Sequence, residues 1–470
     1  MDAWTRGARY AAALSIGAAL LIGAGASIAQ PVEVPPTWGG DFWSRPRLTG
    51  SWGGLRDDLA RKGVVLDVDL LLTPQDVFSG GRNNDEGFWG NAEYTLNVDS
   101  DKLGLWPGGF FKVVGQSGFG SSVLSDVGAL MPPNSAALLP EPNADASALL
   151  NATFAQFLST KFGVFAGKIF TFDGSHGEFT GNYRTQFTNL GFAFPMALDL
   201  VPISAFGGGI IVLPWEGAVL SAMALDPSGT PADDDVGDAF DDGATVVASL
   251  KAKIEPFGLV GHQTVGGMWS DKSRLSLIQD PSNIVTLLAN ERFPRLQDPG
   301  PILTRVLERF FPGLLVPVQP ANRDDSTWAV FYSFDQYFWQ PDDDPKRGIG
   351  IFFHFGAADA ETSPVEYSYA MGIGGNGVVP GRPRDTFGIG WLRVEFSDDL
   401  VPFLRQNLDL GLDHEDALEM YYNVSVTNWL SVSLDLQVIH TGLKKKLGSG
   451  NNLTDVDTAV VGGLRAYVRF

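Results

Sequence analysis

The feature that most constrains this chain is a series of long segments in which apolar and polar residues alternate. The segment WLSVSLDLQV (429–438) places leucine or valine at every second position, with serine, aspartate or glutamine between them. The closing residues LRAYVRF (464–470) alternate in the same way and end on Phe470. A period of two residues predicts β-strands that have one apolar face and one polar face. The apolar faces must then be covered, either by a protein core or by lipid.

The length of these segments favours lipid. We expect about sixteen strands, near 64–77, 88–99, 109–118, 151–160, 162–171, 204–213, 217–226, 244–255, 258–270, 327–339, 348–358, 365–374, 386–397, 416–427, 429–440 and 459–470. Strands of soluble proteins are commonly about five or six residues long, whereas about nine to eleven tilted residues cross a bilayer. Many of the predicted strands fall in the second class.

The connections between these strands alternate between long and short. Long loops are expected at 78–87, 119–150, 172–203, 227–243 and 271–326, and short turns at LGLWPG, TKFG, PWEG, EPFG, QPDDDPKRG and TNW. Two connections fit poorly, since ADAETSP is short for a loop and NGVVPGRPR is long for a turn. Long loops at one rim and tight turns at the other are typical of outer-membrane barrels.

The C-terminal residue fits the same architecture. Backbone groups in hydrocarbon must all be hydrogen-bonded, so a sheet survives there only if it closes on itself. Closure would pair the last strand with the first and place Phe470 in the aromatic girdle at the membrane boundary, where we expect it to act as an assembly signal for the barrel-assembly machinery. Other aromatic residues expected in the girdle are Trp269, Tyr337, Phe338, Trp339 and Trp429. The predicted fold class is therefore an all-β, closed antiparallel transmembrane barrel. A soluble exported β-protein, such as a lectin or a glycanase, is the alternative.

The N-terminus predicts export from the cytoplasm. Arg6 and Arg9 precede an apolar run at 11–28, and a small-x-small cleavage pattern lies before Gln30. This arrangement is typical of a secretory signal peptide at 1–29, and an uncleaved membrane anchor is the alternative. We expect the protein to reside in the outer membrane of a Gram-negative cell.

Between the signal peptide and the barrel, residues 30–63 are expected to form a leader that ends in a short periplasmic helix. Thr49 or Ser51 is a possible N-cap for this helix, and Gly63 would end it. The barrel itself would then occupy residues 64–470.

Composition excludes several classes of function. The chain contains no cysteine and has a formal net charge of −21, which argues against a nucleic-acid partner. The sequence GIGGNG (372–377) fits a dinucleotide-binding pattern, but a turn follows it where a helix would be required. The five histidines show no metal-ligand spacing, and the acidic stretches 233–242 and 342–344 match no EF-hand loop. We therefore predict no enzymatic activity, no cofactor and no metal site.

The polar faces of the strands are expected to line a water-filled lumen. The candidate lumen residues are Asp67, Asp69, Glu93, Asp99, Lys251, Lys253, Asp335, Arg393, Glu395, Glu419, Asp435, Arg465 and Arg469. Both charge signs occur, which suits neutral hydroxylated solutes that exchange hydrogen bonds with water and the wall. The alternative for each residue is that it solvates the wall without selecting a solute.

The long loop at 172–203 is the best candidate for a constriction folded into the lumen. Its candidate residues are Asp173, His176, Glu178, Tyr183, Arg184, Gln186 and Asn189. Polar planar groups would bind sugar hydroxyls, and Tyr183, Phe187 and Phe192 would offer aromatic faces to the apolar side of a sugar. The alternative is an ordinary exposed loop with a small core of its own.

Several segments resemble one known family. The chain is similar to the carbohydrate-selective porins of the OprB family in these segments, in this order: RLTGSWGGLRDDLARKGV, the middle segment GVFAGKIFTFDG and GNYRTQFTN, GGNGVVPGRPRDTFGIGW, EMYYNVSVTNWLSVSLDLQVI and the GLRAYVRF end. The resemblance implies a sixteen-stranded outer-membrane porin that lets glucose-like sugars diffuse through a pore with charged residues at its narrowest point. It leaves open a general or cation-preferring porin, and whether the pore is a monomer or a homotrimer.

Overall fold

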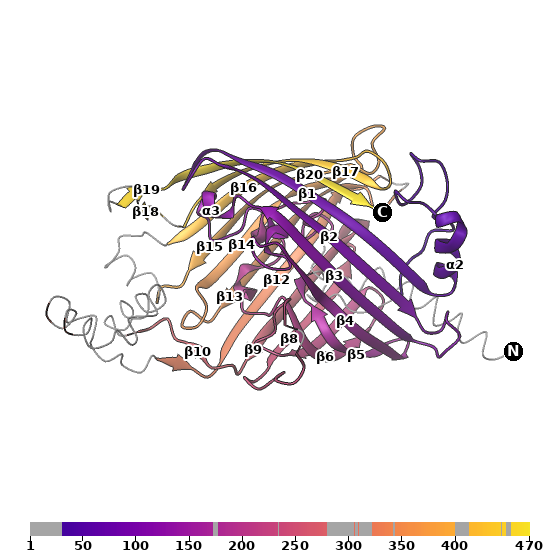
Figure 1. Cartoon of the computed structure of the whole chain (residues 1–470), viewed down its shortest axis with the longest axis horizontal. Helices are drawn as coiled ribbons and strands as arrows, with labels where there is room; N and C mark the ends of the chain where they lie inside the picture. Colours follow the sequence, from indigo (N-terminus) through magenta and orange to yellow (C-terminus); the bar gives the residue numbers. More distant parts are fainter. Residues whose placement is uncertain are drawn as a thin grey trace.

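The computed structural model describes residues 31–172, 177–233, 235–279, 305, 309, 322–341, 344–399, 413–442, 444–447 and 453–470. They form one closed antiparallel barrel of sixteen strands, and each strand is bonded to its neighbour along the chain (Figure 1). The last strand, β20, pairs with β17 on one side and with β1 on the other, for example Asp69 with Arg469. The predicted fold class is confirmed.

The strand bounds follow the two-residue pattern closely. The barrel consists of β1 (Val64–Gly81), β2 (Glu86–Asp99), β3 (Gly109–Ser121), β4 (Ala146–Ser159), β5 (Phe162–Phe170), β6 (Ser204–Val212), β7 (Ala218–Leu225), β8 (Thr245–Ile254), β9 (Gly261–Ser270), β12 (Thr327–Trp339), β13 (Gly348–Ala358), β14 (Val365–Asn376), β15 (Thr386–Phe396), β16 (His414–Ser425), β17 (Leu430–His440) and β20 (Asp457–Arg469). All sixteen predicted strands are present.

Side-chain burial identifies the two faces of the barrel wall. Leu434 and Leu464 are cross-strand partners and are 62% and 48% exposed, while their neighbours Asp435 and Arg465 are 7% and 1% exposed. Apolar side chains therefore point outward, and the polar side chains between them point inward. This is the reverse of a soluble protein, so the alternative of a soluble lectin or glycanase is wrong.

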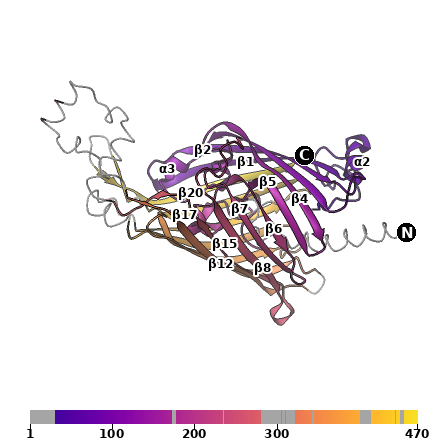
Figure 2. The same cartoon turned by 90° about the horizontal axis from the view of Figure 1, so that it is seen from below.

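The two ends of the barrel differ. Figure 1 shows the C-terminus and helix α2 (Leu55–Arg61) at one end, and the small sheets β10–β11 and β18–β19 at the other. Figure 2 likewise shows α2 and α3 (Leu124–Val127) at opposite ends. The strands of the small sheets are β10 (Arg274–Leu275), β11 (Arg323–Asp324), β18 (Lys445–Leu447) and β19 (Leu453–Asp455). In an outer-membrane barrel the end with long loops is extracellular.

The predicted long loop at 78–87 is mostly strand, which corrects the expectation. β1 continues to Gly81 through two shifts of register against β20, and β2 already begins at Glu86. Gly80 lies at φ +72, and a Cβ there would lie 1.9 Å from the carbonyl oxygen of Thr458. Only glycine fits this bulge, which lets the ladder extend into the predicted loop.

The predicted periplasmic helix is present, but its cap differs from the expectation. A 3-10 turn, η1 (Trp52–Gly54), precedes α2, and the residue before α2 is Gly54 in a left-handed conformation, without a side-chain cap. Neither Thr49 nor Ser51 caps the helix through its side chain, whereas Gly63 follows it at φ +83, as predicted. None of the described helices is long and apolar enough to cross a membrane.

The aromatic residues expected in the girdle divide into two groups. Trp269, Phe338 and Trp339 are between 46% and 54% exposed on the outer face. Tyr337 and Trp429 are buried, which corrects the expectation: Tyr337 points into the lumen, and Trp429 packs edge-on against Phe42 of the leader. Tyr337 differs from its neighbours because adjacent residues of a strand face opposite sides.

Candidate functional site

The described part of the loop between β5 and β6 (171–172 and 177–203) lies inside the barrel, against its wall. Phe187 of this loop stacks on Phe192 with ring centroids 4.4 Å apart, and it meets Tyr421 of β16 edge-on at 4.8 Å and Phe352 of β13 at 5.3 Å. Rings from a loop and from two distant strands thus share one apolar cluster. The prediction that this loop folds inward agrees with these contacts.

Glycines on the wall make room for the phenylalanines of the loop. A Cβ at Gly350 would lie 2.4 Å from the ring of Phe179, and one at Gly388 would lie 2.7 Å from the ring of Phe187. Both distances are shorter than carbon–carbon contact permits, so any larger residue would push the loop away from the wall. The wall is therefore shaped to hold this loop.

Buried polar groups then fix the loop to β16 and β17. The carboxylate of Glu419 accepts hydrogen bonds from the backbone N–H groups of Thr188 and Asn189, at 2.5 and 3.0 Å. The Nδ2 group of Asn189 donates to Gln437, and the hydroxyl of Thr188 lies 3.2 Å from Asp435. Two predicted lumen residues, Glu419 and Asp435, are therefore buried beneath the loop and hold it to the wall.

A second loop, 122–145, also packs against the inner wall. Trp89 donates to the carbonyl of Ala136 at 3.0 Å, and Asn91 donates to the carbonyl of Leu139 at 2.8 Å. The carboxylate of Glu415 accepts from the backbone N–H of Met131 at 2.8 Å. From the sequence we expected only a long loop at 119–150. Its apolar composition (ALMPPNSAALLP, 129–140) was the available signal that it packs inside.

One polar cluster lies between the inward loop and strands β1, β2 and β20. Arg184 forms an ion pair with Glu93 at 2.5 Å, and its guanidinium lies 4.6 Å from the centre of the Tyr183 ring. The hydroxyl of Tyr467 donates to Asp69 at 2.8 Å, and Arg47 of the leader pairs with the same carboxylate at 2.5 Å. Charges of both signs therefore meet on this side of the lumen.

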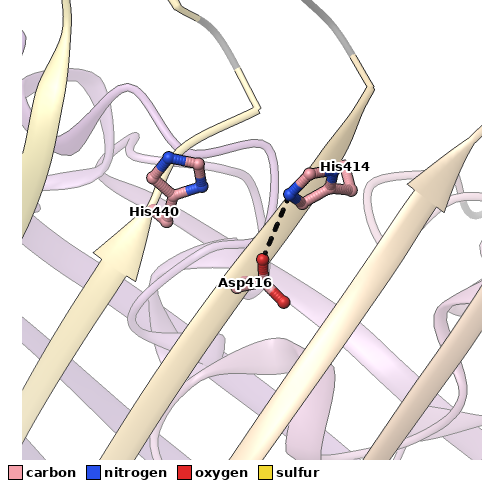
Figure 3. Close-up of side chains that lie close together, drawn as sticks. All are labelled: His414, Asp416 and His440. Carbon is pink, nitrogen blue, oxygen red and sulfur yellow. Dashed lines mark ion pairs between the residues drawn. The ribbon is translucent and has the colours of Figure 1, made fainter.

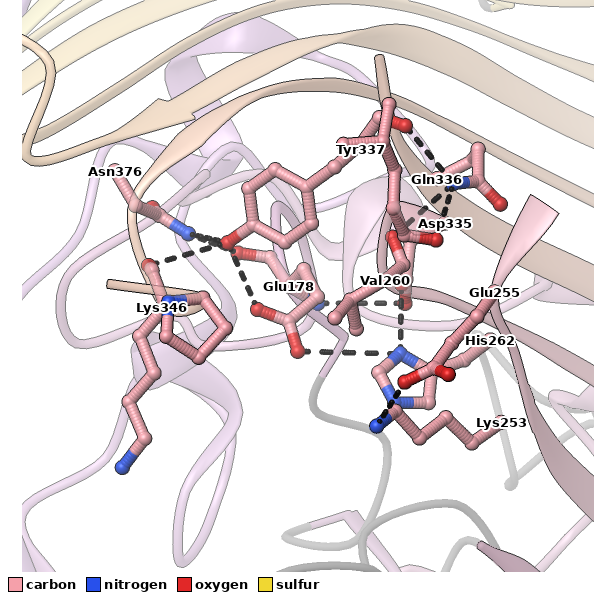
Figure 4. A network of polar contacts seen from close by, with 12 residues as sticks. Glu178, Lys253, Glu255, Val260, His262, Asp335, Gln336, Tyr337, Lys346 and Asn376 are labelled. Atoms are coloured by element: carbon pink, nitrogen blue, oxygen red, sulfur yellow. Dashed lines mark hydrogen bonds and ion pairs between the residues drawn. The ribbon is translucent and has the colours of Figure 1, made fainter. Parts of the chain in front are cut away.

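A second polar cluster lies between the loop and strands β9, β12 and β14 (Figure 4). His262 is 2.8 Å from the carboxylate of Asp335, and the hydroxyl of Tyr337 donates to Glu178 at 3.0 Å. Asn376 donates to the oxygen of Tyr337 at 2.8 Å. Burial raises the pKa of the Glu178 carboxyl above its usual range, and the charge of Asp335 raises it further.

A cavity of about 140 Å³ adjoins the second cluster. Its lining combines polar residues, among them Lys251, His262 and Asp335, with aromatic residues such as Phe172 and Phe331. This combination suits a small hydroxylated molecule, because the polar groups can hydrogen-bond its hydroxyls and the aromatic rings can pack against its apolar face.

The structure places most of the predicted lumen residues on the inner face. By the alternation of burial and the pairing of strands, the inward residues are Asp67, Asp69, Glu93, Asp99, Lys251, Lys253, Asp335, Glu419, Asp435, Arg465 and Arg469. Of these, Arg465 is fully buried beneath the loop, where it donates to the carbonyl of Tyr183 at 2.7 Å. Their role in solute passage remains a proposal.

Arg393 and Glu395 lie on the outer face, so their expected place on the lumen wall is wrong. They share one face of β15 with Ile389, which is 43% exposed. Arg393 pairs in register with Asp416, which lies on the same outward face as Leu418. These charges stand at the loop end of the strand, where an outer face can meet water and lipid headgroups instead of hydrocarbon.

The predicted constriction residues also divide into groups. Glu178, Arg184, Gln186 and Asn189 belong to the networks inside the barrel, where Gln186 donates to the carbonyl of Glu178 at 3.0 Å. Asp173 and His176 lie outside the described residues.

The expected aromatic platform for a sugar needs correction. Tyr183 and Phe187 are each 3% exposed, and Phe192 is fully buried. The rings of Phe187 and Phe192 pack against the wall, whereas the ring of Tyr183 packs against Phe172 and the Arg184 guanidinium within the loop, so all three rings are covered by protein.

Comparison with known families decides the assignment. The model of the carbohydrate-selective porin, OprB family, matches residues 89–470. The chain belongs to the OprB family. OprB-family proteins of this fold are outer-membrane porins, that is, passive channels, and this placement agrees with the outward apolar faces described above.

Individual relatives of the OprB family support the fold. Porin B of Pseudomonas aeruginosa is 30% identical over 140 residues, which are 27% of this chain and 29% of Porin B. The match thus spans less than a third of that relative. The high-pH structure of Pseudomonas putida OprB is 20% identical, covers 92% of this chain and 100% of its own, and has a TM-score of 0.70. The low-pH structure of the same protein reaches 0.53 at 16% identity, with 91% and 99% covered.

Proposed function

We propose that carbohydrates diffuse passively through this porin across the outer membrane, with glucose-like monosaccharides as the typical solutes. The observation that carries the proposal is the described part of the inward loop, residues 177–203, which contributes to two polar clusters, one with Glu93 and one with Asp335. Sugars are neutral and rich in hydroxyls, so they can form hydrogen bonds with the ion-paired side chains of the wall. An ion, in contrast, would need a wall group of opposite charge to replace its lost hydration.

The test is conductance of the purified protein in planar bilayers. We expect steady channels whose ionic current falls when glucose is added, because a sugar in the narrow passage excludes ions. Liposome swelling with sugars of graded size should give rates that fall steeply with size. Currents that are indifferent to glucose, in a protein that does form channels, would contradict a sugar pore.

A general, cation-preferring porin is the second candidate. The formal net charge of −21 favours it, as do inward carboxylates such as Asp67 and Asp69. The reversal potential under a salt gradient separates the two functions. A strong cation preference, together with liposomes that take up no sugar, would support the general porin.

Lowering the pH is expected to reduce the cation preference of the pore through Glu178. Because the pKa of Glu178 is raised, its carboxylate takes up a proton at a higher pH than an ordinary glutamate, and acidification removes a negative charge from the lumen. In water, the attraction between this charge and a monovalent cation about 4 Å away is about 1 kcal/mol, which corresponds to about a fivefold change in the local cation concentration.

Reversal potentials measured at pH 7 and pH 5 would check this prediction. The pH-dependent loss of cation preference should be smaller in Glu178→Gln. Glu216→Gln removes a carboxylate from an exposed turn and serves as the matched control. Equal pH responses in wild type and Glu178→Gln would exclude Glu178 as the titrating group.

We further propose that residues 1–29 are a signal peptide, that 30–63 form a periplasmic leader, and that Phe470 is read by the barrel-assembly machinery. In support, the N–H group of Phe470 donates to the carbonyl of Val68 at 2.8 Å, which places the C-terminal residue at the seam of the barrel. Residues 1–30 lie outside the described residues.

A further inference from the structure

Three potential metal ligands meet on the outer face of the barrel at its loop end. His414 begins β16, Asp416 lies two residues further on the same face, and the cross-strand partner of Asp416 is His440 at the end of β17. One ligand atom from each residue lies within 4.8 Å of the others (Figure 3). Sequence spacing showed no metal-ligand grouping, because the register of β16 and β17 joins residues that are distant along the chain.

The distance between two of the ligand atoms matches a metal site. Nε2 of His414 lies 3.3 Å from Oδ2 of Asp416. In tetrahedral zinc sites the nitrogen and oxygen ligands lie about 2.0–2.1 Å from the metal, so two of them are about 3.3 Å apart. An ion can therefore bind both Nε2 of His414 and Oδ2 of Asp416 without a change in the backbone. A rotation of the His440 ring would supply the third bond to the metal.

Neighbouring carboxylates and cations orient these ligands. Nδ1 of His414 lies 3.4 Å from the carboxylate of Asp413, which is placed to accept its proton and leave a lone pair on Nε2. Arg393 donates from Nε to Oδ1 of Asp416 at 2.9 Å, and this bond can persist while Oδ2 binds a metal. Both contacts are typical of the outer shell of a metal centre.

Two cationic side chains oppose metal binding and therefore limit the affinity of the site. Nζ of Lys444 lies 3.2 Å from Nδ1 of His440, and Arg393 also donates to Oδ2 of Asp416 at 3.1 Å. A metal ion needs a lone pair on one of the two imidazole nitrogens of His440, and the same ammonium group also lies 3.4 Å from the other nitrogen, Nε2, so it stands beside both candidate ligand atoms. Lys444 stands in a connection after β17 and must turn away on binding, so we expect a micromolar affinity.

We propose that His414, Asp416 and His440 form a surface site for a borderline divalent metal ion, Zn²⁺ foremost. Two imidazoles and one carboxylate suit Zn²⁺, Ni²⁺ or Cu²⁺, whereas Ca²⁺ and Mg²⁺ prefer a shell of oxygen ligands. The fourth position would face outward and take a water molecule. A bound ion would link β16 to β17 next to the extracellular loops, apart from the lumen.

The test is a calorimetric titration of the full chain, in detergent micelles, with Zn²⁺ as the only added metal. We expect one site per chain with micromolar affinity. His414→Ala and His440→Ala should each weaken binding at least tenfold, and Lys444→Met should strengthen it several-fold because a competing cation is removed. His262→Gln, which alters a histidine inside the barrel, should leave Zn²⁺ binding unchanged.

Folding of each variant is checked by its heat-dependent mobility in gel electrophoresis. Cu²⁺ as a second probe should show nitrogen splitting in its electron paramagnetic resonance spectrum, and this splitting should be lost in the His414→Ala, His440→Ala double variant. The proposal is overturned if the wild type binds no Zn²⁺, or if folded His414→Ala and His440→Ala bind as tightly as wild type. Loss of binding in His262→Gln alone would place the site in the lumen.

Discussion

Replacing Glu419 with alanine is expected to release the inward loop and to raise the single-channel conductance several-fold. Glu419 is fully buried and accepts hydrogen bonds from the backbone N–H groups of Thr188 and Asn189. Leaving a buried donor without a partner costs about 1–3 kcal/mol. With two such donors the loop is destabilised by about 2–6 kcal/mol, which shifts it toward detached states more than tenfold.

Planar-bilayer recordings check this prediction. The Glu419→Ala channel should show larger and noisier currents, and liposome swelling should discriminate less between small and large sugars. The matched control is Glu395→Ala, which removes the same side chain from the outer face and should leave conductance unchanged. If folded Glu419→Ala retains wild-type conductance and sugar discrimination, the loop does not depend on this anchor.

The second large effect is expected at the seam where β1 meets β20. Arg56 of α2 donates to the carbonyl of Phe470 at 3.0 Å and to the carboxylate of Asp67 at 2.7 Å. Its guanidinium also lies 4.5 Å from the ring centre of Trp38 and 4.8 Å from that of Trp52. A single buried side chain thus joins the leader, the first strand and the last residue.

Arg56→Ala should lower the free energy of unfolding by about 3 kcal/mol, because it removes one partner of a buried ion pair together with its hydrogen bonds. The remaining Arg47–Asp67 pair, at 2.9 Å, limits the loss. Urea titration in lipid vesicles, followed by tryptophan fluorescence, measures this change.

Arg61→Ala provides the control for the seam, because it removes the same residue type from the same helix. Arg61 and its partner Asp58 are 69% and 57% exposed. Exposed ion pairs contribute about 0–1 kcal/mol, so this change should be small. Equal destabilisation by both substitutions would mean that Arg56 contributes no more than a surface arginine.

The barrel could be predicted because it is encoded by a pattern of residues that are adjacent in the sequence. Alternation with a period of two residues identifies a strand and its two faces without knowledge of its neighbours, and the length of the alternating segments indicates a bilayer. Pairs such as Leu434 and Asp435 show this directly, since one is exposed and the other buried as the pattern predicts. The closing pair of strands follows from the requirement that every backbone group in hydrocarbon is bonded.

The same local pattern failed where depth in the membrane mattered. Arg393 and Glu395 continue the outward face of Ile389, but beyond the region where that face must be apolar. A charged residue there resembles an inward residue in sequence. Burial of Phe187 and Phe192 against the wall likewise depended on glycines of distant strands, such as Gly388 and Gly390.

The alternation of residue types was thus enough to predict the strands, most of their inward and outward faces, and the closure of the sheet, because each depends on neighbouring residues and on the solvent that surrounds them. Which polar groups meet could be read only from the folded chain. The contact of Glu419 with Thr188, the pairing of Arg184 with Glu93, and the gathering of His414, Asp416 and His440 all depend on strand register and on the path of a loop through the barrel. Register and loop path arise from the sum of many long-range contacts, which no local pattern records.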